Sequence, residues 1–413
     1  MAETPSALSG IRVLDLTQHI AGPFCTKLLA DYGADVIKLE RPPMGDLSRR
    51  IGPFPNDQPH PEKSGLSMYL NTNKRGISVD LTRPEGKQIF LELITRVDVL
   101  VENFRPGVMA KLGLSYESLS EVKPDLVMVA ISNFGQTGPC RDYKANELIE
   151  YAMGGQMQST GLPDRPPVKL GGNIGMYQTG EAAALACCLA IFQKEMGGGG
   201  DYVDISIYET QANNQDRRSI YMLNYQYTGQ VTQRHGDTPG LAFGIFPCKD
   251  GYMCFWSGIT RFPRAAELVG MPELANDPRF ADYQSGLTQE AIDEFNCTIL
   301  LPWLMERDMH QAWKESQALG LATSPIMSPG QYFDDPYFRE RGFWTEVDQP
   351  SVGKLDVPGR PFIMQACPWS MRRPAPALGQ HNEEVLQTEL GYTKGEVAKL
   401  TADGVLHSRT VVS

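Results

Sequence analysis

Short apolar segments that alternate with helical patterns constrain the fold of this chain more than any other feature. Helical spacing of apolar residues occupies 24–32, 84–96 and 180–196, the last ending at four glycines, and 21–23 forms a break before the first. Runs typical of strands lie at 11–16, 36–39, 97–101, 126–131 and 202–207. Because β-α-β alternation is typical of parallel strands, we predict an α/β fold with a large, Rossmann-like, doubly wound sheet.

The length of the chain predicts two domains. A chain of 413 residues exceeds what one hydrophobic core usually serves. From residue 209 the pattern becomes polar, a hairpin pattern follows at 246–252, and three prolines after 322 mark a second connection. We therefore expect a large α/β domain at 1–208 and 346–413, linkers at 209–235 and 323–345, and a small α+β domain at 236–322.

The composition disfavours several classes of partner. With 38 basic and 49 acidic residues, the net charge is −11, which disfavours binding to nucleic acid or to an anionic membrane surface. No segment approaches the roughly 18 apolar residues of a membrane span, and residues 1–10 lack a signal-peptide pattern. We therefore expect a cytoplasmic protein. Eight cysteines without CxxC spacing or partnering histidines predict free thiols and no metal site.

Two polar loops have compositions suited to a ligand. Residues 71–75 place Lys74 and Arg75 beside two asparagines, which suits phosphate groups, although a solvated basic turn is the alternative. The loop 102–107 directly follows the strand 97–101, and ligands bind at the carboxyl ends of such strands. A purely structural turn is the alternative there.

Five motifs occur in a fixed order along the chain. They are 21–23 (AGP), 33–40 (GADVIKLE), 71–75 (NTNKR), 102–107 (ENFRPG) and 134–139 (FGQTGP). In this order they resemble the family III CoA-transferases, and the resemblance extends from about residue 8 to residue 386. It implies an interlocked dimer, in which each chain threads the other, and coenzyme A or an acyl-CoA as substrate.

The resemblance also implies which residues bind the substrate. A polyanion such as CoA needs local cations in an acidic chain. By likeness to the family, the CoA-binding candidates are Arg41, Asn73, Lys74, Arg75, Asn103, Phe104, Arg105, Lys111 and Lys144. The candidates at the acyl site are His19, Ile20 and Asn146, and Ile20 stands where relatives have an acyl-contacting glutamine.

Met176 occupies the position of the family's nucleophile. In relatives an aspartate follows a glycine and precedes a Thr-Gly pair by three residues, whereas here 175–180 reads GMYQTG. The family's carboxylate attacks the acyl-CoA thioester to give a mixed anhydride, which CoA thiolate converts to an enzyme thioester. A thioether cannot form these intermediates. Met176 is therefore expected to fill an apolar position.

Glu147 is the candidate for a substitute acid. It lies where relatives have a supporting glutamate, so it is a candidate nucleophile or general base. The structural alternative is a carboxylate that complements the dipole in the first turn of a helix. Racemisation is disfavoured, because the family's racemases have a His-Asp pair where this chain has Asn146 and Glu147, and a second aspartate in place of Met176.

The resemblance leads to three hypotheses of function. In the first, the chain is a subunit of a heteromeric CoA-transferase whose homologous partner supplies the aspartate. Such a chain is similar to the benzylsuccinate CoA-transferases of anaerobic toluene degradation, which implies succinyl-CoA as donor and benzylsuccinate as acceptor. In the second, it is an acyl-CoA enzyme that uses Glu147. In the third, it is a non-catalytic acyl-CoA-binding homologue.

Overall fold

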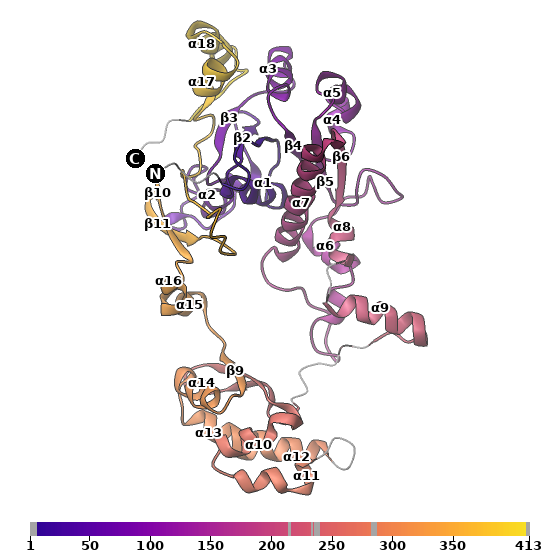
Figure 1. Cartoon of the computed structure of the whole chain (residues 1–413), viewed down its shortest axis with the longest axis vertical. Coiled ribbons are helices and arrows are strands. Elements are labelled where there is room, and N and C mark those ends of the chain that lie inside the picture. The colour runs from indigo at the N-terminus through magenta and orange to yellow at the C-terminus, as the bar shows by residue number, and fades with distance from the viewer. Residues whose placement is uncertain (1–5, 214–215, 233, 235–239, 282–286, 410–413) are drawn as a thin grey trace. The chain divides into compact units, whose positions relative to one another are not determined.

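The computed structural model describes residues 6–213, 216–232, 234, 240–281 and 287–409. The predicted segments 1–208, 209–235, 236–322 and 346–413 each include residues outside the described set. Two compact units are present, the first comprising 1–160, 167–232 and 340–413, and the second 161–166 and 233–339 (Figure 1). The domain limits expected from the sequence stay a prediction.

Six parallel strands form the sheet of the first unit, in the order β3-β2-β1-β4-β5-β6. They are β1 (Arg12–Asp15), β2 (Asp35–Glu40), β3 (Arg75–Ser78), β4 (Val99–Glu102), β5 (Val127–Ser132) and β6 (Asp201–Ser206). This confirms the prediction of an α/β fold with a doubly wound sheet. The strand order reverses between β1 and β4, so the carboxyl ends of these two strands are where a ligand crevice is expected.

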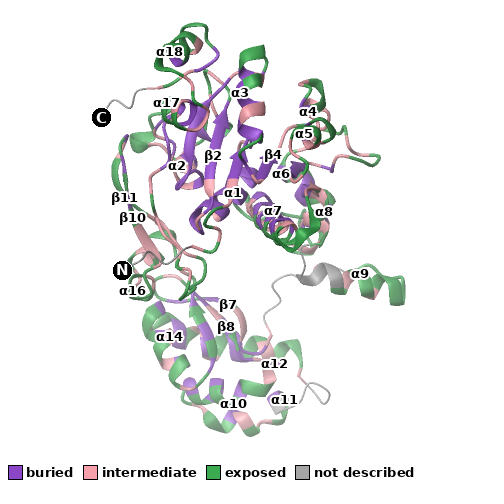
Figure 2. Cartoon of the chain, turned by 45° about the horizontal axis from the view of Figure 1, so that its top comes forward, coloured by how far each residue is buried: buried purple, intermediate pink, exposed green. Residues whose placement is uncertain are grey.

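Helices cover both faces of this sheet. Neighbouring strand residues point to opposite faces, so Val13 and Leu14 of β1 are both fully buried, but in different hydrophobic clusters. Helices α1 and α7 pack on the face of Val13, and α3 and α5 on the face of Leu14. Figure 2 shows the buried strands beside helices whose outer sides are exposed. The helices of this unit are α1 (Ala21–Asp31), α2 (Gly65–Leu70), α3 (Pro84–Ile94), α4 (Val108–Lys111), α5 (Tyr116–Val122), α6 (Glu147–Met153), α7 (Ile174–Gln193), α8 (Ile207–Asn213), α9 (Asp216–Thr228), α17 (Asn382–Glu384) and α18 (Lys394–Ala402).

Two helix starts differ from the sequence expectation. Helix α1 begins at Ala21, so residues 21–23 form its first turn and not a break. Pro23 is tolerated in this turn because the N–H groups of the first turn of a helix have no partner within the helix. Helix α7 begins at Ile174 and not at residue 180. Glycine has a low helix propensity, but Gly175 packs so closely on Gln211 that a Cβ atom at this position would lie 3.0 Å from the Gln211 side chain. This tertiary contact outweighs the low propensity and allows the helix to begin before residue 180.

Helix α7 also corrects the expectation that no segment resembles a membrane span. Among the described residues, α7 together with the helical turn that continues it to residue 198 is long and apolar enough to cross a membrane by length and composition, and half of its most apolar stretch is buried within the protein. It packs against α1, with the sulfur atoms of Cys25 and Cys187 3.9 Å apart. Its composition is that of a helix in the core of the unit.

The second unit contains a smaller sheet. Antiparallel strands β7 (Phe243–Pro247), β8 (Tyr252–Trp256) and β9 (Ala322–Pro325) form it, which confirms the hairpin expected at 246–252. The helices that follow β8 are α10 (Gly258–Leu268), α11 (Pro278–Ala281), α12 (Gln289–Asp293), α13 (Leu301–Met305), α14 (Met309–Ala318), α15 (Pro329–Asp334) and α16 (Pro336–Glu340). The chain then returns to the first unit, where β10 (Trp344–Gln349) and β11 (Gly353–Pro358) form an antiparallel pair.

Candidate active site

The loops that follow β1 and β4 are tied together where the strand order reverses. The backbone N–H of Gln18 donates to Asn103 Oδ1 (2.9 Å), and Asn103 Nδ2 donates to the carbonyl oxygen of Gln18 (2.8 Å). The next residue, His19, has a φ of 74°, and its N–H donates to Asp46 Oδ1 (2.8 Å). These bonds fix the loop at the carboxyl ends of the strands, and Gln18 lines two cavities that open there.

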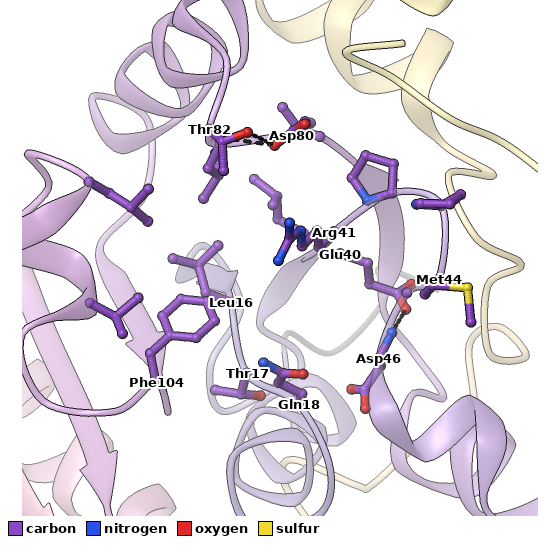
Figure 3. Close-up of a pocket in the computed structure, with 18 of the residues that line it drawn as sticks. Leu16, Thr17, Gln18, Glu40, Arg41, Met44, Asp46, Asp80, Thr82 and Phe104 are labelled. Atoms are coloured by element: carbon purple, nitrogen blue, oxygen red, sulfur yellow. Dashed lines mark hydrogen bonds between the residues drawn. The ribbon is translucent and has the colours of Figure 1, made fainter. Parts of the chain in front are cut away.

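The larger cavity has a volume of about 560 Å³. Figure 3 shows Arg41 between Leu16 and Phe104 on one side and Asp46 on the other. The Phe104 backbone N–H donates to Glu102 Oε2 (2.6 Å), which fixes the turn that carries the ring. The wall also includes Thr17, Gln18, Pro42, Pro43, Met44, Asp80, Thr82, Val108 and Leu112.

Two carboxylates on this wall are neutralised inside the protein. Glu40 accepts two bonds from the guanidinium of Arg49, both 2.7 Å long. Asp46 pairs with Lys38 Nζ at 2.8 Å. Burial by itself would raise the pKa of Asp46, but the Lys38 ammonium and the hydrogen bonds from Lys38, Ser48 and His19 have the larger effect. The pKa of Asp46 is therefore lowered. Glu40 and Asp46 therefore present little net negative charge to a ligand.

Cations remain available to the larger cavity. Arg41 and Arg50 are exposed, and neither guanidinium has an ion-pair partner in the described part of the chain. The remaining carboxylate, Asp80, accepts two bonds from Thr82 (2.9 and 2.7 Å). Two arginines against one carboxylate give the cavity an excess of positive charge, which suits an anion.

The smaller cavity, of about 200 Å³, brings together six of the residues singled out in the sequence. These residues come from the β1–α1 loop, the β4 end, the start of α6 and the first turn of α7. They are His19, Ile20, Asn103, Asn146, Glu147 and Met176, and the other lining residues are Gln18, Ala21, Ile131, Asn133, Ala145 and Ile207.

Met176 forms part of an apolar wall of this cavity. Its side chain is 7% exposed and packs in one hydrophobic cluster with Ile20, Ile131 and Ile207. A neutral thioether fits such surroundings without the cost of burying a charge.

Glu147 lies on the polar wall. Its Oε1 accepts a bond from the backbone N–H of Gly175 (3.0 Å) and one from Lys169 Nζ (3.3 Å). Its Oε2 is buried and has no hydrogen-bond partner among the described residues. Asn146 caps α6 by accepting from the backbone N–H of Ile149 (3.3 Å). One oxygen of Glu147 therefore holds the residue before Met176, while the other remains unused.

Two charged or titratable groups act on Glu147: Lys169, which lies outside the cavity lining, and His19, which lines the cavity. Lys169 also donates to the carbonyl oxygens of Leu170 (2.8 Å) and Gly172, so it clamps the loop before α7. Lys169 lies 22 residues from Glu147 and in no motif, so no sequence pattern indicated it. Burial lowers the pKa of His19, although the charges of Asp46 and Glu147 raise it in part.

Three of the predicted CoA-binding residues line neither cavity and bond within the protein. Lys74 is 0% exposed; its Nζ donates to Asp15 Oδ2 (3.0 Å), and burial lowers the pKa of Lys74 to about 8. Asn73 is 3% exposed, and its side chain bonds to groups of the chain. Arg75 pairs with Asp35 (2.5 Å) and with a glutamate of the C-terminal segment.

Apart from Arg41, the three remaining predicted cations are exposed and line neither cavity. Arg105 and Lys111 lie on either side of Val108, which lines the larger cavity, and Lys144 lies shortly before α6. Within the described residues, no group of three His, Cys, Asp or Glu side chains could hold a metal ion.

Comparison with known proteins decides the family. The sequence profile of CoA-transferase family III matches residues 8–382. The chain belongs to CoA-transferase family III. Its family transfers CoA between acyl-CoA thioesters and free acids, so the chain is a CoA-transferase with an acyl-CoA as substrate.

Relatives of this CoA-transferase match over almost their whole length. Succinyl-CoA–D-citramalate CoA-transferase of Chloroflexus aurantiacus is 36% identical over 410 residues, which cover 97% of this chain and 98% of the relative. Succinyl-CoA:(R)-benzylsuccinate CoA-transferase subunit BbsE of Thauera aromatica is 30% identical over 412 residues, 97% of this chain and 98% of the relative. The crystal structure of a CAIB/BAIF family protein from Brucella suis has a TM-score of 0.79 at 28% identity, covering 92% of this chain and 98% of that chain.

Proposed function

We propose that this chain is the non-nucleophilic subunit of a heteromeric family III CoA-transferase, and that a homologous subunit supplies the nucleophilic aspartate. The observation that carries the proposal is Met176, a buried thioether in the apolar wall of the smaller cavity. Both relatives named above are succinyl-CoA enzymes by name, and one is a benzylsuccinate transferase subunit. We therefore infer succinyl-CoA as donor and benzylsuccinate as acceptor, in anaerobic toluene degradation. A cytoplasmic location stays a prediction.

An apolar stripe on α7 and the turn after it supports association with a partner. Leu185 and Leu189 are each 61% exposed, Phe192 is 64% exposed and Met196 is 74% exposed. Steps of four, three and four residues place these side chains on one helix face. An exposed apolar stripe of this kind is typical of a subunit interface, and it agrees with an interlocked dimer.

The larger cavity is the proposed site of the CoA nucleotide. Arg41 and Arg50 would pair with phosphate groups, and Phe104 offers an apolar face. Gln18 belongs to both cavities, so the thioester end of the ligand would extend toward the smaller one. Exposed Arg105, Lys111 and Lys144 are available to the ligand's outer phosphates, whereas Asn73, Lys74 and Arg75 would support the scaffold.

Arg41→Ala should weaken CoA binding by roughly 10- to 100-fold, because a hydrogen bond to a charged group is worth about 1.5–3 kcal/mol. Isothermal titration calorimetry with CoA measures this. Arg96→Ala is the control, since Arg96 is exposed and lines neither cavity. Equal CoA affinity of the two variants would contradict placement of the nucleotide in the larger cavity.

The unpartnered Oε2 of Glu147 favours a second candidate, an acyl-CoA enzyme that uses Glu147 as nucleophile or general base. That function predicts turnover by the isolated chain and its loss in Glu147→Gln. A non-catalytic acyl-CoA-binding homologue would instead bind CoA without turnover, with or without a partner. Thioester exchange measured on the chain alone and together with an aspartate-containing homologue distinguishes the main proposal from both.

A further inference from the structure

Helix α6 carries a second buried carboxyl group, Glu150, one turn after Glu147. Glu150 is 0% exposed, and neither of its oxygens has a hydrogen-bond partner within the described residues. Residues three apart on a helix are neighbours. With the Oε2 of Glu147, three unpartnered oxygens of two carboxyl groups are thus buried in one helical turn.

Two negative charges cannot be buried there at low cost. An unpaired carboxylate in the interior is strongly unfavourable, and a second one beside it adds repulsion. Lys169 compensates one charge through the Oε1 of Glu147, but no cation is bonded to Glu150 in the described part of the chain. Because the Glu150 oxygens are enclosed, a proton is the one counter-charge small enough to reach them.

We propose that the pair of Glu147 and Glu150 carries one proton in the resting site, that Glu150 holds it, and that the charge of Glu147 governs its release, so that the two act as a coupled acid–base unit beside the smaller cavity. Glu150 is then a positioning residue, which keeps Glu147 ionised and bonded to Lys169 and Gly175. Loss of the proton leaves two adjacent carboxylates, and gain of a second one breaks the ion pair with Lys169. Any role of this pair in CoA transfer depends on the function proposed above, whereas its protonation does not.

The titration of Glu150 agrees with this arrangement. Burial, and then the negative charge of Glu147, raises the pKa of Glu150 from 4.5 to about 7. Like-charge pairs in enzymes show the same behaviour, since two close carboxyl groups cannot both ionise.

The surroundings of α6 contain few other charges. Lys169 is the nearby cation, and His19 is close enough for the charge of Glu147 to raise its pKa against the opposing effect of burial. Helix α8 contributes the neutral Gln211, which bonds to Gly175, and the exposed Glu209, while the turn at 157–159 has no ionisable residue. None of these groups other than Lys169 supplies a positive charge to the pair at neutral pH.

Infrared difference spectroscopy on the full-length chain tests the proposal. The spectra are compared in the Glu102→Gln background, because burial also raises the pKa of Glu102, a buried carboxyl group outside the pair, to about 7. In that background the C=O band of a protonated carboxyl group should disappear with a midpoint near pH 7, and adding Glu150→Gln should remove this transition. Glu147→Gln should shift the midpoint to lower pH, because the neighbouring negative charge is gone. Glu102→Gln by itself is the matched control, since it should remove the Glu102 band and leave the Glu150 transition in place.

The outcomes are separable from those of the proposed function, because the band is read without turnover. In the Glu102→Gln background, a transition that persists when Glu150→Gln is added, or a midpoint that Glu147→Gln leaves unchanged, would overturn the proposed coupling of Glu147 and Glu150. Thermal unfolding gives a second readout. A raised pKa means that the contribution of Glu150 to stability is full below pH 4.5 and is lost as the pH rises through 7. The wild-type Tm should therefore fall more over this range than that of Glu150→Gln.

Discussion

Replacing Asp15 with asparagine should lower the free energy of unfolding by about 3–5 kcal/mol, the scale for breaking a buried ion pair. Asp15 is 0% exposed and lies between the ammonium groups of Lys74 (3.0 Å) and Lys38 (3.8 Å). Burial alone would raise the pKa of Asp15, but these cations and two threonine hydroxyls lower it to about 2. A neutral asparagine side chain would leave two buried ammonium groups without this counter-charge.

Urea denaturation of the full chain at neutral pH measures the effect of Asp15→Asn. Asp125→Asn is the control, because the Asp125 side chain is 48% exposed and its pair with Lys194 is worth at most about 1 kcal/mol. Since the pKa of Asp15 is lowered, its contribution is present above pH 3.8 and is lost as the pH falls through 2. Equal unfolding free energies for the two variants would show that the buried network does not stabilise the fold.

Met176→Asp should give the isolated chain thioester-exchange activity that the wild-type chain lacks. The new carboxylate would stand on the wall of the smaller cavity, which we propose as the place where a nucleophilic carboxylate attacks the thioester. We expect an increase on the order of 10²-fold or more over the wild-type chain, the scale of one positioned catalytic group. Ile20, Ile131 and Ile207 around it would raise the pKa of this carboxyl, so the gain should be greater at higher pH.

The control for this gain is Met176→Asn, which introduces a polar side chain of similar size without a nucleophile. It should remain as inactive as the wild-type chain. If Met176→Asp binds CoA normally and still shows no exchange, then the missing carboxylate is not what prevents turnover by this chain, and the account of Met176 would be wrong.

The fold was largely predictable because the strands carry a strong sequence signal. Strands β4 (VLVE) and β5 (VMVAIS) are almost entirely apolar, since both faces of a doubly wound sheet are covered, and β1 and β2 have apolar centres. The start of α7 was not predictable, because Gly175 is accepted there through its close packing on Gln211, a contact between residues distant in the chain. Only the folded chain creates such a contact.

The candidate site was predictable where a motif ends a strand or begins a helix. Ile20 after β1 and Asn103 after β4 lie in one cavity because the strand order reverses between these strands. Lys74 illustrates the limit, since its sequence context suits a phosphate but its amine is enclosed beside Asp15. Glu150 could not be singled out either, because a glutamate in a helical pattern is normally exposed.

The proposed division of labour between two subunits is tested most directly by thioester exchange. The wild-type chain is assayed alone and co-expressed with an aspartate-containing homologue encoded beside it, using succinyl-CoA and a panel of free acids. The account predicts exchange in the pair only, abolished when the partner's aspartate is changed to asparagine. Exchange by the chain alone, lost in Glu147→Gln, would contradict it.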